Sequence, residues 1–177
     1  RMTTSTKKAS VFSKFLSTGT KHLKIAFIYE KTIASSSWTY SHELGRLHLD
    51  EVFNDQVSSI YYDNINSKNI DDAINDAIKN NCTLIFTTSP TFSKASLKAA
   101  IANPKITILN CSLHDPHSSM RTYYARMYEA KFIMGAVAGA MSEHDRIAYI
   151  ADYPIYGTIA NINAFALGVK MTNPRAK

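Results

Sequence analysis

Apolar and polar positions along the chain follow two alternating patterns. Short apolar runs rich in β-branched and aromatic residues predict strands at 24–29, 57–62, 82–87, 106–111 and 147–151. Between and after these runs, apolar residues recur at helical spacing and predict helices at 38–53, 70–79, 90–101, 123–141 and 155–171. This alternation is typical of βαβ units, so the expected fold class is α/β, a parallel sheet with helices on both faces.

The helix at 38–53 carries an apolar stripe that we expect to face the sheet. Its members are Tyr40, Leu44, Leu47 and Val52. Ser36 or Ser37 is the expected N-cap of this helix, and Ser89 is that of the helix at 90–101. Ligands of parallel α/β sheets bind beyond the carboxyl ends of the strands. This rule directs the search for a site to the loops at 30–37, 87–92, 110–122 and 151–158.

The net charge of +6, from 20 Lys and Arg against 14 Asp and Glu, suggests a nucleic-acid partner. The distribution of this charge argues against such a partner. Residues 1–24 hold six basic residues and no acid, which leaves 14 of each sign in 25–177. We therefore interpret 1–22 as a basic leader or linker rich in Ser, Thr and Lys. The folded remainder is neutral, and a chain that is 45% hydrophobic does not belong to the disordered class.

Neither a membrane span nor a signal peptide is predicted. The uncharged run at 132–142 is far shorter than the roughly 20 apolar residues that a span needs. Residues 11–16 are interrupted by polar side chains and do not form the apolar core of a signal peptide. The chain starts at Arg1 rather than Met, and we interpret it as cut from a longer one.

Motifs of the common catalytic classes are absent from the sequence. It contains no dinucleotide fingerprint, P-loop or nucleophile elbow. His42 and His48 are six residues apart and do not share a helical face, which excludes a helical zinc motif. His114 and His117 could chelate a metal, but a solvated turn is the favoured interpretation. We therefore expect a non-enzymatic protein with no catalytic residue, metal or cofactor.

Two further features are interpreted as structural. Cys82 and Cys111 fall in apolar runs without metal or disulfide spacing, so we expect buried thiols. Gly135 and Gly139 belong to a small-residue stretch at 135–140 that lets a helix approach a neighbour closely. The expected use of this stretch is tight packing of a helix on the sheet.

The loop after the first strand is the best candidate for recognition. It places Ser35, Ser36 and Ser37 before Trp38, the one tryptophan of the chain. A capping serine leaves backbone N–H groups directed outward, and the indole offers a flat apolar face with one N–H donor. These groups suit a planar ligand with polar edges, such as a purine. The alternative is that Trp38 is a core aromatic under the loop.

Four segments resemble, in order, the basic membrane protein family, which comprises substrate-binding proteins of ABC transporters, typically for purines or nucleosides. Ser37–Arg46 (SWTYSHELGR) is similar to the family's G-W-T-Y-x-H-x-x-G-R segment. The other matching segments are Leu84–Ala99, Tyr124–Met141 and Ile147–Pro174. The matches span nearly all of the folded part, and their combination is specific.

The resemblance implies the two-lobed periplasmic-binding-protein type I fold. Residues 23–145 would form the N-terminal α/β lobe, and 146–177 would start the second lobe. A complete family member is much longer, so most of lobe two would be missing from this chain. An incomplete lobe exposes a sheet edge and apolar surface. We expect further sequence, or self-association with another copy, to cover that surface.

The resemblance also implies site residues in the first lobe. Trp38 matches the aromatic residue that stacks on the base, and Thr39 follows it at a position of polar contact. Ser35 stands where the family usually has Asp, and a hydroxyl can donate or accept a hydrogen bond but carries no charge. This departure leaves the identity of the ligand open.

Two more loops are implied in the same way. Ser89 and Phe92 lie in the third-strand loop that the family uses beside the ligand, although Phe92 could equally be a core residue. Tyr153 and Ile155 lie in the second-lobe loop that faces the cleft. The implied ligand-binding set therefore draws on both lobes.

The leading hypothesis is a module that captures a purine base or nucleoside between two closing lobes. Its partner would be an ABC permease, implying an extracytoplasmic, membrane-associated location, or a fused signalling domain, implying a cytoplasmic one. One alternative is a nucleotide-handling α/β enzyme, for which the loops offer Asp115, Asp152 and His114. Another is a degenerate lobe kept for protein–protein contacts, which the departure at Ser35 motivates.

Overall fold

The structure, a computed structural model, describes residues 22–112, 117–151 and 156–177. Residues 1–21 of the predicted leader lie outside these ranges. So do two of the predicted ligand-binding residues, Tyr153 and Ile155.

The chain divides into two compact units, and each is considered by itself. One extends to Cys111 and includes 117–121, and the other consists mainly of Thr122–Lys177. This division comes earlier in the sequence than the lobe boundary expected at 145. How the two units correspond to the lobes of a complete family member stays a prediction.

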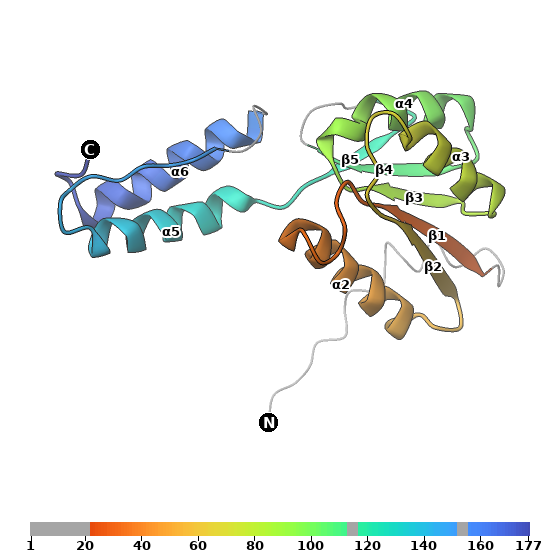
Figure 1. The fold of residues 1–177 in the computed structure, drawn as a ribbon, viewed down its shortest axis with the longest axis horizontal. Helices are drawn as coiled ribbons and strands as arrows, with labels where there is room; N and C mark the ends of the chain where they lie inside the picture. Colours follow the sequence, from red (N-terminus) through yellow and green to blue (C-terminus); the bar gives the residue numbers. More distant parts are fainter. Residues whose placement is uncertain (1–21, 113–116, 152–155) are drawn as a thin grey trace. The chain divides into compact units, whose positions relative to one another are not determined.

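A five-stranded sheet organises the N-terminal part of the chain, in the order β2-β1-β3-β4-β5 (Figure 1). The strands are β1 (Leu23–Ile28), β2 (Val57–Tyr62), β3 (Leu84–Thr87), β4 (Thr107–Cys111) and β5 (Arg121–Tyr123). β1 pairs in parallel with β2 and β3, and β3 pairs in parallel with β4. The predicted α/β fold class is confirmed.

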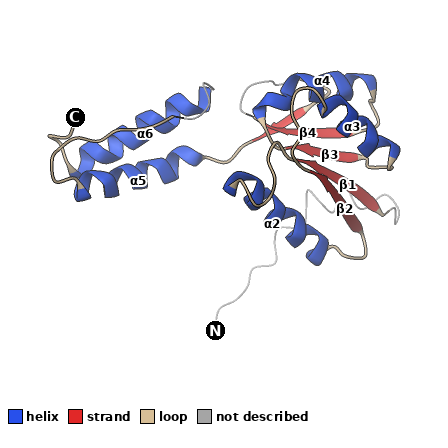
Figure 2. Cartoon of the chain, viewed as in Figure 1, coloured by secondary structure: helices blue, strands red, loops and turns tan. Residues whose placement is uncertain are grey.

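Helices cover both faces of this sheet (Figure 2). α2 (Ser37–Val52) lies on one face, and α3 (Ile70–Lys79) and α4 (Ser93–Ala102) lie on the other. The helix predicted at 90–101 begins as the short 3-10 helix η1 (Pro90–Phe92) before α4. Ser89 is the N-cap of η1, as predicted, because its hydroxyl accepts a hydrogen bond from the N–H of Thr91.

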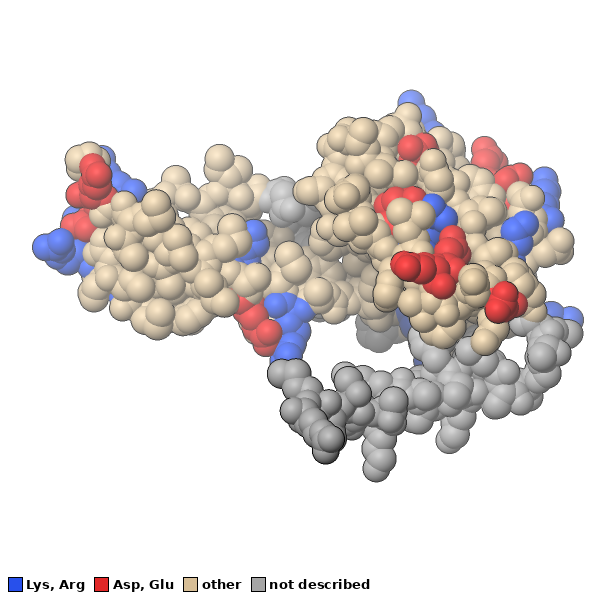
Figure 3. All heavy atoms as spheres, turned by 90° about the horizontal axis from the view of Figure 1, so that it is seen from below, with Lys and Arg blue, Asp and Glu red and all other residues tan. Residues whose placement is uncertain are grey.

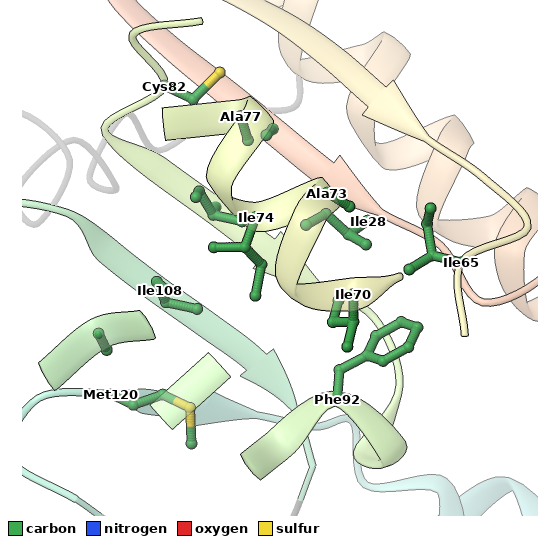
Figure 4. Packing of buried hydrophobic residues seen from close by; sticks show 13 residues of the cluster. Ile28, Ile65, Ile70, Ala73, Ile74, Ala77, Cys82, Phe92, Ile108 and Met120 are labelled. Atoms are coloured by element: carbon green, nitrogen blue, oxygen red, sulfur yellow. The ribbon is translucent and has the colours of Figure 1, made fainter. Parts of the chain in front are cut away.

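The larger hydrophobic core lies between the sheet and the layer of α3 and α4 (Figure 4). Ala26 and Ile28, two residues apart on β1, both belong to it, since alternate side chains of a strand share a face. Ile74 of α3 and the fully buried ring of Phe92 fill the space between the layers. Cys82 is also part of this core, which confirms that its thiol is buried.

α2 packs on the sheet with a different side from the one predicted. The stripe expected to be buried is exposed by 48–54%: Tyr40, Leu44, Leu47 and Val52. The residues buried instead are Thr39, Glu43 and Arg46. The reason is that Tyr29, directly after β1, and Ser59 of β2 offer polar partners to Glu43 and Arg46 in the middle of the helix. Apolar packing is confined to its C-terminal end, at Leu49 and Phe53.

The second unit contains two helices, α5 (Met127–Met141) and α6 (Tyr156–Thr172), that pack closely against each other. A Cβ added at Gly135 would overlap the backbone carbonyl of Phe165, and one at Gly168 would overlap that of Phe132. The small-residue stretch therefore packs helix on helix, and the expected packing on a sheet is wrong. Glycine is required because each helix backbone lies against the other.

The strand predicted at 147–151 is not formed. A strand needs a neighbour to pair its N–H and C=O groups, and no described strand pairs with this segment. Backbone hydrogen bonds instead join Ile147 N–H to Lys177 O at 3.0 Å and Lys177 N–H to Asp145 O at 2.7 Å. The side chain of Ile150 is left 95% exposed.

Large apolar side chains of the second unit are exposed along both helices. They include Ile133, Met141, Leu167 and Met171, each more than 60% exposed. The apolar surface that the resemblance implied is therefore present on the described residues, while self-association through it stays a prediction. Among the described helices, none has the length and apolar character required to cross a membrane.

Replacing Gly135 by Ala should destabilise the α5–α6 pair. The added methyl group forces the helices apart at Phe165, and overpacking of this kind costs about 1–3 kcal/mol. Gly45→Ala in α2 is the matched control, because a Cβ there meets nothing within 4 Å. The control should gain about 0.5–1 kcal/mol from helix propensity. Urea titrations followed by circular dichroism measure both changes, and equal stability of the two variants would contradict the close approach.

Candidate functional site

The order of the strands reverses at β1, which points to one position for a ligand. The chain passes from β1 to β2 on one side and then to β3 on the other side of β1. In open α/β sheets ligands bind outside the carboxyl ends of the strands at such a reversal. Thr88, directly after β3, joins the two ends, because its N–H and its hydroxyl donate to the carbonyl of Ile28 at 3.1 and 3.0 Å. The loops after β1 and β3 therefore form the candidate site.

Trp38 stands at this position because α2 begins there. The N-cap is Ser36, one of the two predicted candidates, whose hydroxyl accepts from the N–H of Thr39 at 3.2 Å. The indole Nε1–H of Trp38 donates to the carbonyl of Thr88 at 2.8 Å. Trp38 is 39% exposed, so the alternative that it is a core aromatic is wrong. Its N–H is already bonded, which leaves the ring face as its contribution to a ligand site.

A carboxylate that sequence reasoning missed lies at the same strand ends. Glu30 follows β1 closely and is half-buried, and its Oε2 accepts a hydrogen bond from the hydroxyl of Ser89 at 2.6 Å. That length is typical of a charge-assisted bond. The signal that could have identified Glu30 is its place: it is the first charged residue after a buried strand of the expected sheet.

Asn110 holds the loop after β3 from the end of β4. It is fully buried, and its Nδ2 donates to the hydroxyl of Thr87 at 2.8 Å and to the carbonyl of Ser89 at 2.9 Å. The hydroxyl of Thr87 also bonds to that of Ser96 in α4 at 2.8 Å. This chain of bonds fixes Ser89, and through Ser89 it fixes Glu30.

Three other predicted site residues are placed differently. Ser35 is exposed, and its hydroxyl accepts from that of Thr32 at 2.7 Å in a local turn. Thr39 is 1% exposed within α2, and Phe92 is a fully buried core residue, the alternative that the sequence left open. The structure thus brings together Trp38 and Ser89 but not the other three.

A buried ion pair fixes α2, and with it Trp38, on the sheet. Arg46 donates through Nε to Glu43 Oε2 at 2.7 Å and through Nη2 to Oε1 of the same carboxylate at 2.5 Å. The hydroxyl of Tyr29, which follows β1, donates to Glu43 at 2.9 Å. The Arg46–Glu43 pair lies within α2, so the bond from Tyr29 is what joins the pair to the sheet and sets the rotation of the helix about its own axis.

The same guanidinium extends the network to β2. Its Nη1 donates to the hydroxyl of Ser59 at 2.8 Å and to Asp50 at 3.1 Å, and Ser59 donates to Asp50 at 2.6 Å. The guanidinium carbon of Arg46 also lies 5.2 Å from the ring centroid of Tyr61, a cation–π contact. A charge that would be costly to bury alone is therefore fully partnered.

The pKa values of the network follow from these contacts. The hydrogen bond from Arg46 lowers the pKa of Glu43, while burial and the bond to Glu43 raise the pKa of Tyr29. His42, whose ring centroid lies 5.1 Å from that of Trp38, has its pKa lowered by burial. The lowered pKa favours the neutral form of the imidazole beside the indole.

No candidate metal centre is found in the part of the chain that the structure describes. There, no three His, Cys, Asp or Glu side chains lie together. His117 is exposed, and its Nδ1 accepts from the N–H of Ser119 at 3.1 Å. The other residues named for the metal and enzyme alternatives, His114, Asp115 and Asp152, lie outside the described ranges. Cys111 is buried, as predicted, and burial raises the pKa of the Cys82 thiol.

Charged side chains are interspersed on the surface seen in Figure 3. Acidic and basic side chains of the described residues are both visible there on a mainly uncharged surface, without a continuous basic patch. This arrangement agrees with the balance of 14 basic and 14 acidic residues in 25–177. The absence of a nucleic-acid partner stays a prediction.

The stability of the fold should fall in acid through Glu43. A carboxyl whose pKa is lowered by folding stabilises the native state above its unfolded pKa of about 4.3, and this is lost as pH falls through the folded pKa. Glu43→Gln should flatten that acid slope and cost on the order of 3 kcal/mol at pH 7, because Arg46 loses its main partner. Glu51→Gln, exposed on the same helix, is the control and should retain the slope. Urea titrations from pH 3 to 7 make the comparison, and an unchanged slope in Glu43→Gln would contradict it.

Two relatives of this chain are named for different solutes. It is 29% identical over 153 residues to a purine-binding protein of Brucella abortus, covering 86% of this chain and 44% of that protein. It is 24% identical over 151 residues to a protein of Haloferax volcanii described as an ABC transporter glucose-binding protein, covering 85% and 38%. The chain thus spans less than half the length of either relative.

Solved structures share the fold. A solute-binding protein of an ABC transporter system from Aeropyrum pernix K1 superposes with a TM-score of 0.71 at 13% identity, covering 86% of this chain and 44% of that one. A transcriptional activator of the comK gene from Bacillus halodurans gives 0.68 at 17% identity, covering 86% and 51%. The model of one family, PnrA-like ABC transporter substrate-binding proteins (Bmp), matches residues 22–177. This confirms the resemblance read from the sequence: the chain belongs to the Bmp family of PnrA-like ABC transporter substrate-binding proteins.

Proposed function

We propose that this protein binds a purine base or nucleoside at the carboxyl ends of β1 and β3. The observation that carries the proposal is Trp38, whose ring is 39% exposed while its N–H is bonded to the carbonyl of Thr88. A fixed and partly exposed indole is a stacking platform, and every purine has a π-face to stack on it. The relative from Brucella abortus, a purine-binding protein, supports the same ligand class.

The proposed action is capture without chemical change. A ligand would stack on Trp38 in the first unit and be enclosed when a second lobe closes over it. Tyr153 and Ile155 remain the proposed contacts from that side. The family supplies solutes to ABC permeases, so a permease is the proposed partner, with a fused signalling domain as the alternative. The location of the protein would depend on its partner: outside the cytoplasm if it serves a permease, and inside it if it is fused to a signalling domain.

Glucose is the rival ligand, because the relative from Haloferax volcanii is described as glucose-binding. An aromatic face also suits the apolar side of a sugar ring. The two ligands differ in their contact with the indole ring. A purine overlaps the ring across its whole plane, whereas a hexose offers only C–H groups. A panel that contains both ligands therefore separates the two hypotheses.

Trp38→Ala in the intact protein should weaken binding of adenosine and guanosine by roughly 10- to 100-fold. Loss of base–aromatic stacking costs about 1–3 kcal/mol. Isothermal titration calorimetry measures the affinities. Tryptophan fluorescence should report the same event as a change that is present in the wild-type protein and lost in Trp38→Ala. Tyr40→Ala is the matched control, because Tyr40 is an exposed aromatic of the same helix that lies outside the candidate site.

Three results would contradict the proposal. One is the absence of heat with any purine base or nucleoside, together with binding of glucose. Another is an unchanged affinity for purine nucleosides in Trp38→Ala. The third is chemical conversion of the nucleoside, detected by chromatography after incubation, which would favour the enzyme hypothesis.

A further inference from the structure

We infer that Glu30 selects the ligand by accepting hydrogen bonds from its edge, so that the site prefers guanine-type purines to adenine-type ones. The inference rests on the proposed function and specifies the ligand class of the same site. It also accounts for the departure at Ser35, where the family usually has Asp. The carboxylate missing from that position is supplied by Glu30, from a different part of the same loop.

The backbone around Glu30 is held on both sides. Tyr29, the preceding residue, is fully buried; its N–H donates to the carbonyl of Tyr62 at 2.8 Å, and its carbonyl accepts from Ile65 at 3.1 Å. Glu30 therefore leaves the central strand at a fixed point, beside the loop after β3. A carboxylate on rigid backbone can discriminate between ligands that differ by one hydrogen atom.

Ser89 has no hydrogen-bonding capacity left for a ligand. A hydroxyl has one hydrogen and two lone pairs. The hydrogen is donated to Glu30 Oε2 at 2.6 Å. The lone pairs accept from the N–H of Thr91 at 3.2 Å and, since the hydrogen of Ser89 is engaged, from the hydroxyl of Thr91 at 2.8 Å. Ser89, predicted as a ligand contact, is thus a positioning residue for Glu30.

The carboxylate itself has capacity left. Ser89 bonds to Oε2, and none of the described residues donates a hydrogen bond to Oε1 or forms an ion pair with Glu30. Asn110, fully buried beneath this loop, fixes Ser89 through its backbone carbonyl at 2.9 Å. The second oxygen is therefore a fixed acceptor, joined to the stacking platform through Ser89 and its neighbour Thr88, whose carbonyl binds the indole of Trp38.

The chemistry of this acceptor ranks the purines. A carboxylate only accepts hydrogen bonds, and each of its oxygens can accept two. With one of these sites taken by Ser89, both oxygens of Glu30 can still accept, so the group pairs best with adjacent N–H donors. Guanine presents two, at N1 and at the exocyclic N2, and hypoxanthine presents one, at N1. Adenine presents an N6 donor beside an N1 acceptor, and that lone pair would face the negative charge. The expected order of affinity is guanosine, then inosine, then adenosine.

Glu30→Gln in the intact protein tests the inference by calorimetry with the three nucleosides. The variant should bind guanosine roughly 10- to 100-fold more weakly, because a charge-assisted bond is replaced by an amide whose N–H can clash with the donors. Adenosine should bind as well as before or better, because an amide offers both a donor and an acceptor. Glu51→Gln removes an exposed charge from α2 and should change neither affinity.

A second variant guards against loss of the fold. Glu30→Asp keeps the charge but withdraws it by one methylene, so it should retain the preference for guanosine with a smaller loss of affinity. Circular dichroism of each variant verifies the fold. If the wild-type protein binds purines without preferring guanosine, or Glu30→Gln keeps that preference, the inference is wrong while the proposed function stands. If the wild-type protein binds no purine, the proposed function fails first.

Discussion

The reversal of strand order at β1, in a sheet whose neighbouring strands β2 and β3 run parallel to it, is the constraint on which the candidate site depends. Because β2 and β3 flank β1, the loops that follow β1 and β3 meet at one edge of the sheet. Thr88 closes this edge with two bonds to Ile28, and its own carbonyl then receives the indole of Trp38. Stacking platform, carboxylate and supporting amide are therefore all held by strand ends rather than by a mobile loop.

The interface between α2 and the sheet is polar, whereas the sequence pattern predicted an apolar one. Between α2 and the sheet, a guanidinium satisfied by two carboxylates and a hydroxyl replaces the usual aliphatic packing. An apolar interface tolerates small rotations of a helix, whereas a hydrogen-bonded ion pair does not, because each displaced bond leaves a buried charge without its partner. The direction in which Trp38 is presented follows from this rigidity.

Hydrophobic periodicity predicted the positions of the helices and strands well, but predicted less well which of their residues are buried. The strand at 57–62 and the helix at 70–79 begin and end where the pattern placed them. The buried apolar residues of the helix all belong to one core. The predicted orientation of α2 was wrong because Ser59, the partner of Arg46 on β2, lies 13 residues away in the sequence and creates no local pattern. Glu30 was missed for the same reason, since Ser89 lies 59 residues away. The strand at 147–151 failed because strand formation requires a neighbour, which a sequence run cannot supply by itself.

The inverted burial of α2 has a consequence for how the sequence can vary. Tyr40, Leu44 and Leu47 are about half exposed, so among the described residues the buried polar side of α2 constrains the sequence more than this apolar stripe does. Glu43, Arg46 and Ser59 belong to one hydrogen-bonded network that also includes Tyr29 and Asp50, and replacing Arg46 leaves both carboxylates without their guanidinium partner. In related sequences these three positions should therefore change together or not at all, and such covariation would trace the packing of the helix that carries Trp38.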